Sequence, residues 1–353
     1  MNTSGHPPHL VADIGGTNAR FALVDQGSHV PHSEASLPSG DFADLAEAMN
    51  AYLEGLPGAP RPRSACVAIA APTFRDRIVF ANLHWEFSIE KTRRQMDLDR
   101  LVMMNDFAAL AMAIPDIPET HKTPIGDGIA VPNQPVAVVG PGTGLGVAGL
   151  IWQHGHWTPL PGEGGHVSFA PSDDEEVDIF QIVRGSRDRV SAERLLCGSG
   201  LQRLYRTYCK LDRLADDGWR AGVEAAVEER HPALEELKED DLHPAEITER
   251  ALQGRSDRCT RALSRFCGML GTFSGDVALT FGARGGLYLG GGILPRLGTF
   301  LQNSDFRTRF EAKGRMQDYV AAIPTHLITA PIPALTGAAA WLDVVIRMES
   351  AEA

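Results

Sequence analysis

Cysteine is scarce in this sequence, and no two cysteines have the spacing of a redox or zinc site. The five cysteines include no Cys-x-x-Cys pair and no Cys/His cluster: Cys66, Cys197, Cys209, Cys259 and Cys267. Two of them, Cys259 and Cys267, fall on the apolar face of an expected helix, which is typical of core packing. We therefore expect reduced, buried side chains and no structural metal.

Long apolar runs and an excess of basic residues are also missing. No stretch approaches the ~18 consecutive apolar residues of a membrane span, and the opening MNTSGHPPHL lacks the basic-then-apolar pattern of a secretion signal. The 33 Lys and Arg are outnumbered by 45 Asp and Glu, which gives a net charge of -12, whereas nucleic acids are held by clustered basic side chains. We expect a cytoplasmic protein with neither a membrane nor a nucleic-acid partner.

Glycine, by contrast, is abundant, and one glycine pair lies in the stretch around which the chain is organised. Residues 10–25 read LVADIGGTNARFALVD, in which two apolar runs flank Gly15, Gly16, Thr17 and Asn18. This pattern predicts a β-hairpin whose glycines allow positive φ and close approach of a phosphate to backbone N–H groups. Asp13, before the turn, is placed to hold Mg²⁺ through water. An ordinary tight hairpin with a solvated acid explains the same residues.

The rest of the chain alternates expected strands and helices, which is typical of an α/β protein. Strands are expected over 64–72, 77–87 and 101–104, and helices over 41–56 and 107–114. Residues 135–152 repeat the strand, glycine turn and strand of the opening, which suggests two halves of a duplicated fold. A long helix over 256–281, a strand and glycine turn within 285–297, and a last helix over 334–348 follow.

Three glycine-rich bends, at 15–16, 140–146 and 290–292, each follow an apolar strand, which favours a nucleotide site. Residues 144–149 match the dinucleotide fingerprint literally, but the residues after them look like a strand, whereas the fingerprint must open a helix. A P-loop is excluded because the sequence contains no Gly-Lys dipeptide. We therefore expect a phosphate site of another type.

Four further side chains are candidates for substrate chemistry. Asp106 follows Asn105 at the end of an expected strand, where it would accept a proton from a substrate hydroxyl or would only cap the next helix. Glu163 and His166 lie in the glycine-rich loop PGEGGHVSFAP, and as an acceptor and a donor they suit a polyol better than a metal. Each of these, and Glu193 after Ser191, also suits an ordinary loop or helix start.

Taken together, these segments resemble the bacterial glucokinases of the hexokinase and actin-like ATPase superfamily. The matching stretches are DIGGTNARFAL (13–23), VAIAAP (67–72), NDFAALAMAIP (105–115), GPGTGLGVAGL (140–150), LPGEGGHVSFAP (160–171), SAERLLCGSGLQRLY (191–205) and GGLYLGGGILPR (285–296). The resemblance implies a two-domain actin-like ATPase (ribonuclease H-like) fold with an active-site cleft. The small α/β domain would comprise 1–115 plus 334–353, and the large α+β domain 116–333.

The resemblance also implies an activity and a set of roles. The enzyme would transfer the γ-phosphoryl group of ATP to the 6-hydroxyl of D-glucose, with Mg²⁺ near Asp13 and with Asp106 as general base. Asn105, Glu163, His166 and Glu193 would bind the sugar. The phosphates would contact Gly15, Gly16, Thr17, Asn18, Gly142, Thr143 and Gly144, and the adenosine region would include Gly290 and Gly291. A homodimer is expected from the resemblance alone.

Two alternatives stay open at this point. One is a kinase of broader hexose or amino-sugar range. The other is a sugar-sensing protein without turnover, which is disfavoured because only nine residues precede Leu10, too few for the helix-turn-helix of repressor-type relatives. The charged, helix-prone stretch 212–243 looks like a surface insertion, and PIPALTGAAAW (331–341) matches the family only loosely. Both departures concern regulation and assembly rather than chemistry.

Overall fold

The computed structural model describes residues 7–352 except 72, 81, 186 and 215–241. By internal contacts the chain divides into two compact units. Unit 1 comprises Met1–Lys122, Ala148–Pro161 and Ala330–Ala353, and unit 2 comprises Thr123–Val147 and Gly162–Thr329. This grouping assigns 148–161 to the first unit, whereas the expected small domain did not include them; the domain division itself stays a prediction.

Unit 1 contains a five-stranded sheet in the order β3-β2-β1-β4-β7. The strands are β1 (His9–Ile14), β2 (Asn18–Val24), β3 (His32–Pro38), β4 (Ser64–Ile69) and β7 (Arg100–Asn105). The expected hairpin is confirmed, because β1 and β2 pair antiparallel, while β1, β4 and β7 run parallel. Every residue of β4 is buried, as the apolar run that follows Ser64 predicts for a central strand.

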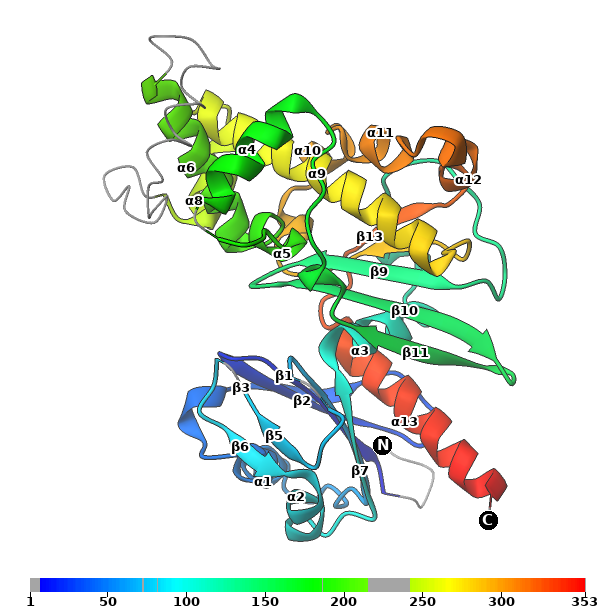
Figure 1. Cartoon of the computed structure of the whole chain (residues 1–353). Coiled ribbons are helices and arrows are strands. Elements are labelled where there is room, and N and C mark those ends of the chain that lie inside the picture. Colours follow the sequence, from blue (N-terminus) through cyan, green and yellow to red (C-terminus); the bar gives the residue numbers. More distant parts are fainter. Residues whose placement is uncertain (1–6, 72, 81, 186, 215–241, 353) are drawn as a thin grey trace. The chain divides into compact units, whose positions relative to one another are not determined.

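The helices of unit 1 are α1 (Leu45–Glu54), α2 (Ile89–Gln95), α3 (Asp106–Ala113) and α13 (Pro333–Glu352). Side-chain caps explain where the first two begin: Asp44 accepts a hydrogen bond from the Glu47 N–H, and Ser88 accepts one from the Lys91 N–H. The last helix, α13, comes from the far end of the chain and packs along α3, as Figure 1 shows.

The expectation of one strand over 77–87 is wrong. Two short strands, β5 (Arg77–Val79) and β6 (Glu86–Ser88), form an antiparallel pair instead. The chain turns back because Trp85 is buried and its indole N–H donates to the carbonyls of Ser39 and Phe42, at 3.1 and 2.8 Å. These are tertiary contacts that the local apolar pattern does not encode.

A six-stranded sheet in the order β11-β10-β9-β12-β13-β8 repeats the order of the first sheet and adds one strand. The strands are β8 (Lys122–Pro124), β9 (Val136–Pro141), β10 (Leu145–Gln153), β11 (His156–Gly162), β12 (Leu287–Leu289) and β13 (Thr325–Ile328). In each sheet the first strand of a strand-turn-strand unit continues into two parallel neighbours, here β12 and β13. The shared order supports the interpretation of a duplicated fold.

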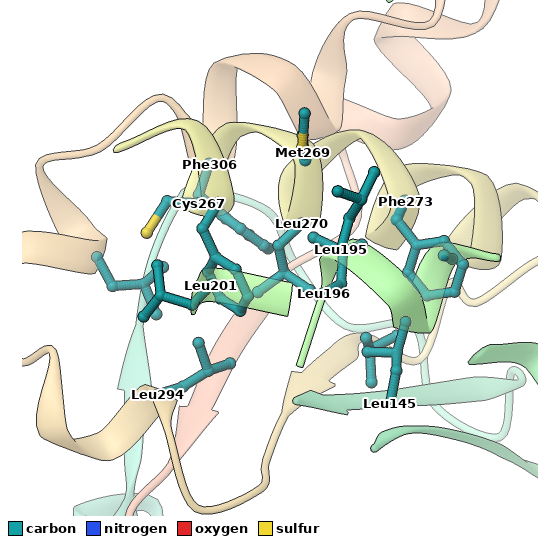
Figure 2. Close-up of a cluster of buried hydrophobic side chains, with 14 of the residues drawn as sticks. Leu145, Leu195, Leu196, Leu201, Cys267, Met269, Leu270, Phe273, Leu294 and Phe306 are labelled. Carbon is teal, nitrogen blue, oxygen red and sulfur yellow. The ribbon is translucent and has the colours of Figure 1, made fainter. Parts of the chain in front are cut away.

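Helices cover the core of unit 2: α4 (Asp174–Arg184), α5 (Ala192–Leu195), α6 (Gly198–Leu214), α8 (Pro244–Leu252), α9 (Asp257–Phe281), α10 (Thr299–Gln302), α11 (Phe306–Glu311) and α12 (Gln317–Ala321). The central one is α9, which Ser256 caps and which ends at Gly282, where φ is 60°. Its apolar side chains, among them Cys267, Leu270 and Phe273, belong to one buried cluster with side chains of α5, α6 and α11 (Figure 2). All five cysteines are buried and free, as expected.

An acidic stretch such as 172–178 would ordinarily lie in solvent, but the structure gives two of its side chains structural roles. Asp173 caps α4, and Glu176 is fully buried, where its carboxylate accepts a hydrogen bond from Arg309 at 2.6 Å. Burial raises the pKa of Glu176, and Arg309 opposes that effect. Arg309 comes from the distant helix α11, so the sequence around 172–178 gives no sign of this partner. Most of the expected insertion at 212–243 lies outside the described residues.

Candidate functional site

The turn between β1 and β2 exposes the expected phosphate-binding residues. Gly16 and Thr17 are exposed, and the Gly15 N–H donates to the Asn18 carbonyl at 2.9 Å, which closes the turn. The reason for glycine differs from the expectation, because neither Gly15 nor Gly16 has a positive φ. A Cβ on Gly16 would instead lie 3.3 Å from the Asn82 carbonyl oxygen, so the close approach of a second loop favours glycine there.

Asp13 lies at the end of β1 beside this turn and is paired with a basic side chain. Its Oδ2 atom accepts a hydrogen bond from Arg20 at 3.1 Å, and its side chain is 18% exposed. Burial raises the pKa of Asp13, and the charge of Arg20 partly offsets that rise. The carboxylate is therefore held in one orientation at the edge of the turn.

Asn105 and Asp106 lie at the same edge of the sheet as the turn. Ile14 is in register with Ile69 and Ile69 with Asn105, so the ends of β1, β4 and β7 are aligned. At ~4.8 Å between strands, Asn105 is roughly 10 Å from the end of β1. The carboxyl edge of parallel strands is where α/β sheets bind ligands. The structure thus brings the candidate base and the candidate phosphate turn to one edge.

The structure also assigns the helix cap. The Asn105 Oδ1 atom accepts hydrogen bonds from the N–H groups of Phe107 and Ala108, at 2.9 and 3.1 Å. Asn105 therefore caps α3, and its amide NH₂ group is left to donate to a ligand. Asp106 is the first residue of the helix, where the positive end of the helix dipole favours a negative charge.

Unit 2 brings two other glycine-rich turns together. The Gly142 N–H donates to the Gly144 carbonyl at 2.8 Å, and Thr143 at the tip of this turn is exposed. Gly291, with φ 83°, lies so near that a Cβ on it would be 2.5 Å from the Pro141 carbonyl oxygen, and the Gly290 N–H donates to Val139 at 3.0 Å. The strand expected after the first of these turns, β10, confirms that residues 144–149 do not open a helix.

Three expected sugar ligands also cluster in unit 2. His166 lies between two acids, with its Nε2 atom 3.8 Å from Glu163 and its Nδ1 atom 3.9 Å from Glu193. Glu193 in addition accepts a hydrogen bond from the Leu145 N–H at 2.9 Å. A Cβ on Gly144 would lie 2.5 Å from that carboxylate. Glu193 therefore joins the candidate sugar ligands to the second phosphate turn.

Backbone pairing explains how Glu193 meets a loop that precedes it by many residues. The Phe169 N–H donates to the Val190 carbonyl, and the Ala192 N–H donates to the Val167 carbonyl, each at 2.9 Å. Ser191 then caps the short helix α5, which carries Glu193. Gly164 and Gly165 let the loop lie directly on β10, because a Cβ on either would collide with Val147 or Leu145.

Sequence reasoning missed the residues that support these turns. Ser39, Leu145 and Gly198 contact them through hydrogen bonds to or from the backbone: Ser39 to Gly15 and Thr17, Leu145 to Glu193, and Gly198 to Gly142. A backbone N–H carries no signal in the sequence, and Ser39 in LPSGD looks like an ordinary turn residue.

Within the part of the chain that the structure describes, no group of three or more His, Cys, Asp or Glu side chains is arranged to hold a metal ion. The same described part contains no helix long and apolar enough to cross a bilayer.

Comparison with known proteins agrees with the motifs. The glucokinase family model matches residues 10–345. A glucokinase of Chromobacterium violaceum is 44% identical over 335 residues, which cover 95% of this chain and 89% of that protein. A glucokinase of Neisseria meningitidis serogroup C is 45% identical over 340 residues, or 96% of each chain. The chain belongs to the glucokinase family.

Solved structures of the glucokinase family share the architecture. The crystal structure of a glucokinase from an Antarctic psychrotroph has a TM-score of 0.79 and 36% identity, covering 96% of this chain and 99% of that one. A ROK family glucokinase from Streptomyces griseus, in complex with glucose and AMPPNP, has a TM-score of 0.60 at 20% identity and shows the common fold. The resemblance and the expected fold class are confirmed.

Proposed function

We propose that this protein transfers the γ-phosphoryl group of ATP to the 6-hydroxyl of D-glucose, giving glucose 6-phosphate and ADP. Besides its family, the observation that carries the proposal is the alignment of Ile14, Ile69 and Asn105 across one sheet edge. That alignment supports an acid, Asp106, acting near a turn that exposes backbone N–H groups. This is the pairing that phosphoryl transfer to an alcohol requires.

Asp106 is proposed as the general base. As the sugar oxygen attacks the γ-phosphorus, a new O–P bond forms, the bond to the β-γ bridging oxygen breaks, and the hydroxyl proton passes to the Asp106 carboxylate. Asp106 is the first residue of α3, so its carboxylate lies beside the free N–H groups at the start of that helix. The ADP oxygen leaves with the electron pair of the broken bond.

The phosphate charge is proposed to be met by backbone N–H groups of the first and second turns, at Gly15 to Asn18 and at Gly142 to Gly144. We assign Gly290 and Gly291, which lie against the second turn, to the adenosine region. Mg²⁺ enters as part of the substrate Mg·ATP, and it would neutralise charge on the β- and γ-phosphates. Asp13 fits such an ion through water, because its carboxylate is oriented by Arg20 at the turn.

Asn105, Glu163, His166 and Glu193 are proposed to bind the sugar hydroxyls. The gaps of 3.8 and 3.9 Å on either side of His166 exceed hydrogen-bond length, and a hydroxyl placed beside them would give each group a partner. A sugar that lacks or inverts that hydroxyl would leave a polar group unpaired, which is the basis for preferring glucose.

The test is a panel of hexoses given to the purified protein with Mg·ATP, read by coupled ADP production. We expect turnover of glucose well above that of mannose, fructose, glucosamine and N-acetylated sugars. Comparable turnover of several hexoses or amino sugars would replace the proposal with a broader sugar kinase. If no sugar were phosphorylated while glucose still raised the melting temperature, a sugar-sensing protein would be the better description.

We further propose that the protein works in the cytoplasm as a homodimer, which rests on the family resemblance. Sedimentation equilibrium should then give about twice the 38.1 kDa chain mass, and the chain mass alone would rule the dimer out.

A further inference from the structure

Ser39 is a fully buried polar residue that touches the first phosphate turn at two points. It begins the single 3₁₀ turn Ser39–Asp41 that follows β3, and its exposed fraction is 0%. Its hydroxyl donates to the Gly15 carbonyl at 2.9 Å, and its backbone N–H donates to the Thr17 carbonyl at 2.9 Å. Two alternate carbonyls of the turn are therefore pulled toward one residue.

These two bonds set the direction of the N–H groups that the turn offers to a ligand. In a planar trans peptide the carbonyl and the next N–H point in opposite directions. Because the Gly15 carbonyl points to Ser39, the Gly16 N–H points away from it, and the Asn18 N–H is related to the Thr17 carbonyl in the same way. The peptide between Gly15 and Gly16 has no Cβ on either side, so little else resists its rotation.

Ser39 is itself held in place by a hydrogen bond from Trp85. Trp85 is 1% exposed, and its indole N–H donates to the carbonyls of Ser39 and Phe42 at 3.1 and 2.8 Å. The loop that carries Trp85 also brings the Asn82 carbonyl against Gly16. The support for the turn is therefore a buried, hydrogen-bonded layer rather than a single side chain.

We propose that Ser39 is a positioning residue for ATP, which keeps the Gly15–Gly16 peptide oriented so that its N–H faces the phosphates. The inference rests on the proposed function, since it takes the first turn to be a phosphate site. Ser39 does not touch the nucleotide in this account. Its hydrogen bonds prevent the Gly15–Gly16 peptide from rotating so that the Gly15 carbonyl, instead of the Gly16 N–H, faces the phosphates.

The decisive variant is Ser39→Ala, which removes the hydroxyl but keeps the backbone N–H bond to Thr17. Losing one hydrogen bond that orients a binding group should weaken AMPPNP binding about 5- to 10-fold. Binding of glucose and of adenosine should change less than about twofold, since neither carries phosphate charge. Ser39→Thr retains the hydroxyl and should recover most of the affinity for AMPPNP.

One control and a second test variant separate this effect from a general loss of structure. Ser274 is also fully buried, lies in α9, and its hydroxyl has no hydrogen-bond partner among the described residues, so Ser274→Ala should leave all three affinities unchanged. Trp85→Phe removes the indole N–H behind Ser39 and should weaken AMPPNP binding selectively but less. It also serves as the test variant should Ser39→Ala fail to fold.

The outcomes distinguish failure of the role proposed for Ser39 from failure of the proposed phosphate site. Thr17→Ala and Gly15→Ala alter the turn itself; if neither changes AMPPNP binding, the turn is not the phosphate site and both proposals fall. If they weaken AMPPNP binding and Ser39→Ala does not, only the role of Ser39 is overturned. Parallel losses for AMPPNP, adenosine and glucose in Ser39→Ala would also overturn it, since they indicate general destabilisation.

Discussion

Asn105 and Asp106 are chain neighbours, and both accept a hydrogen bond at the start of α3. Asn105 accepts hydrogen bonds from the N–H groups of Phe107 and Ala108, and the Asp106 Oδ1 atom also accepts from the Phe107 N–H, at 2.9 Å. The cap on Ala108 therefore depends on Asn105 alone, while that on Phe107 is shared. From the sequence, Asp106 was the candidate cap, whereas the structure gives most of the capping to Asn105. Replacing the Asp106 carboxylate by an amide keeps an oxygen that accepts from the Phe107 N–H, so the substitution removes the charge without removing that hydrogen bond.

We expect Asp106→Asn to fold normally and to bind glucose with near-native affinity while kcat falls by roughly 10² to 10⁴, the usual contribution of a general base. Steady-state kinetics and glucose titration measure the two effects separately. Asp99→Asn, at an exposed acid that pairs with Arg63, is the matched control and should keep full turnover. Near-normal kcat in Asp106→Asn would remove Asp106 from the role of base.

Replacing Asp13 should raise the stability of the protein at pH 7 but lower its activity. Burial raises its pKa in the folded protein, so ionisation costs stability as the pH rises through that pKa, and the cost is absent below the unfolded value of 3.8. Asp13→Asn should therefore melt at a higher temperature than the native protein at pH 7, with the difference vanishing near pH 4. Its kcat/KM for Mg·ATP should fall roughly 10- to 100-fold, as for other groups that hold a metal through water.

Thermal melts at the two pH values and ATP kinetics check this prediction. A variant that is less stable at pH 7 would show that the pair with Arg20 outweighs the cost of burying the Asp13 carboxylate.

At the scale of elements, the close contact between α3 and α13 fixes the position of α3, the helix that begins at Asp106. Gly337 of α13 lies against α3, where a Cβ would overlap the Ala109 carbonyl oxygen and lie 2.9 Å from the Ala113 nitrogen. Both obstacles are backbone atoms, so α3 itself must move to admit a methyl group. This explains why glycine stands in a helix interior, where it is otherwise unfavourable.

Gly337→Ala should lower the free energy of unfolding by about 1 to 3 kcal/mol, the usual cost of overpacking. It should also reduce kcat, because displacing α3 displaces Asp106. Urea unfolding and steady-state kinetics measure these changes. Ser350→Ala, at an exposed position of the same helix, should alter neither. Native stability in Gly337→Ala would show that the two helices separate without cost.

A histidine joins the same two helices to the loop after β2. The Nδ1 atom of His29 is 2.9 Å from Asp116, just beyond α3, and Nε2 is 3.6 Å from Asp343 of α13. The hydrogen bond to Asp116 is the main cause that raises the pKa of His29, burial opposes it, and the charges of both acids add to it.

A raised folded pKa means that this stabilisation is complete below the unfolded value of 6.5 and is lost as the pH rises through the folded value. His29→Gln should therefore destabilise the protein at pH 6, by less than about 1 kcal/mol because the groups are partly solvated. The difference should shrink at pH 8.5. Urea unfolding at both pH values tests it, and an effect that grows with pH would contradict it.

Across the whole molecule, short sequence patterns predicted the helices and strands more reliably than the distant residues that hold them in place. The hairpin at 10–25, the strand before Asn105 and the helix capped by Ser256 were all predicted, because turn glycines, apolar runs and capping residues act over a few neighbours. The single strand expected at 77–87 failed because the fold-back depends on where Trp85 finds its carbonyl partners. The burial of Glu176 was missed because its partner Arg309 comes from α11, more than a hundred residues further along the chain.

The sequence by itself determined the family, the alternation of strands and helices, and the identity of the candidate site residues. These depend on residue types at short spacing, and comparison with known glucokinases confirmed the first two. Only the tertiary structure decided that Asn105 is aligned, through Ile69, with Ile14 just before the first turn. It also decided that Glu193 accepts from the Leu145 N–H and that Ser39 donates to the first turn. Each of these is a hydrogen bond or a strand alignment between segments that are far apart in the sequence. Such contacts form only when folding brings the two segments to hydrogen-bonding distance, so no short sequence pattern predicts them.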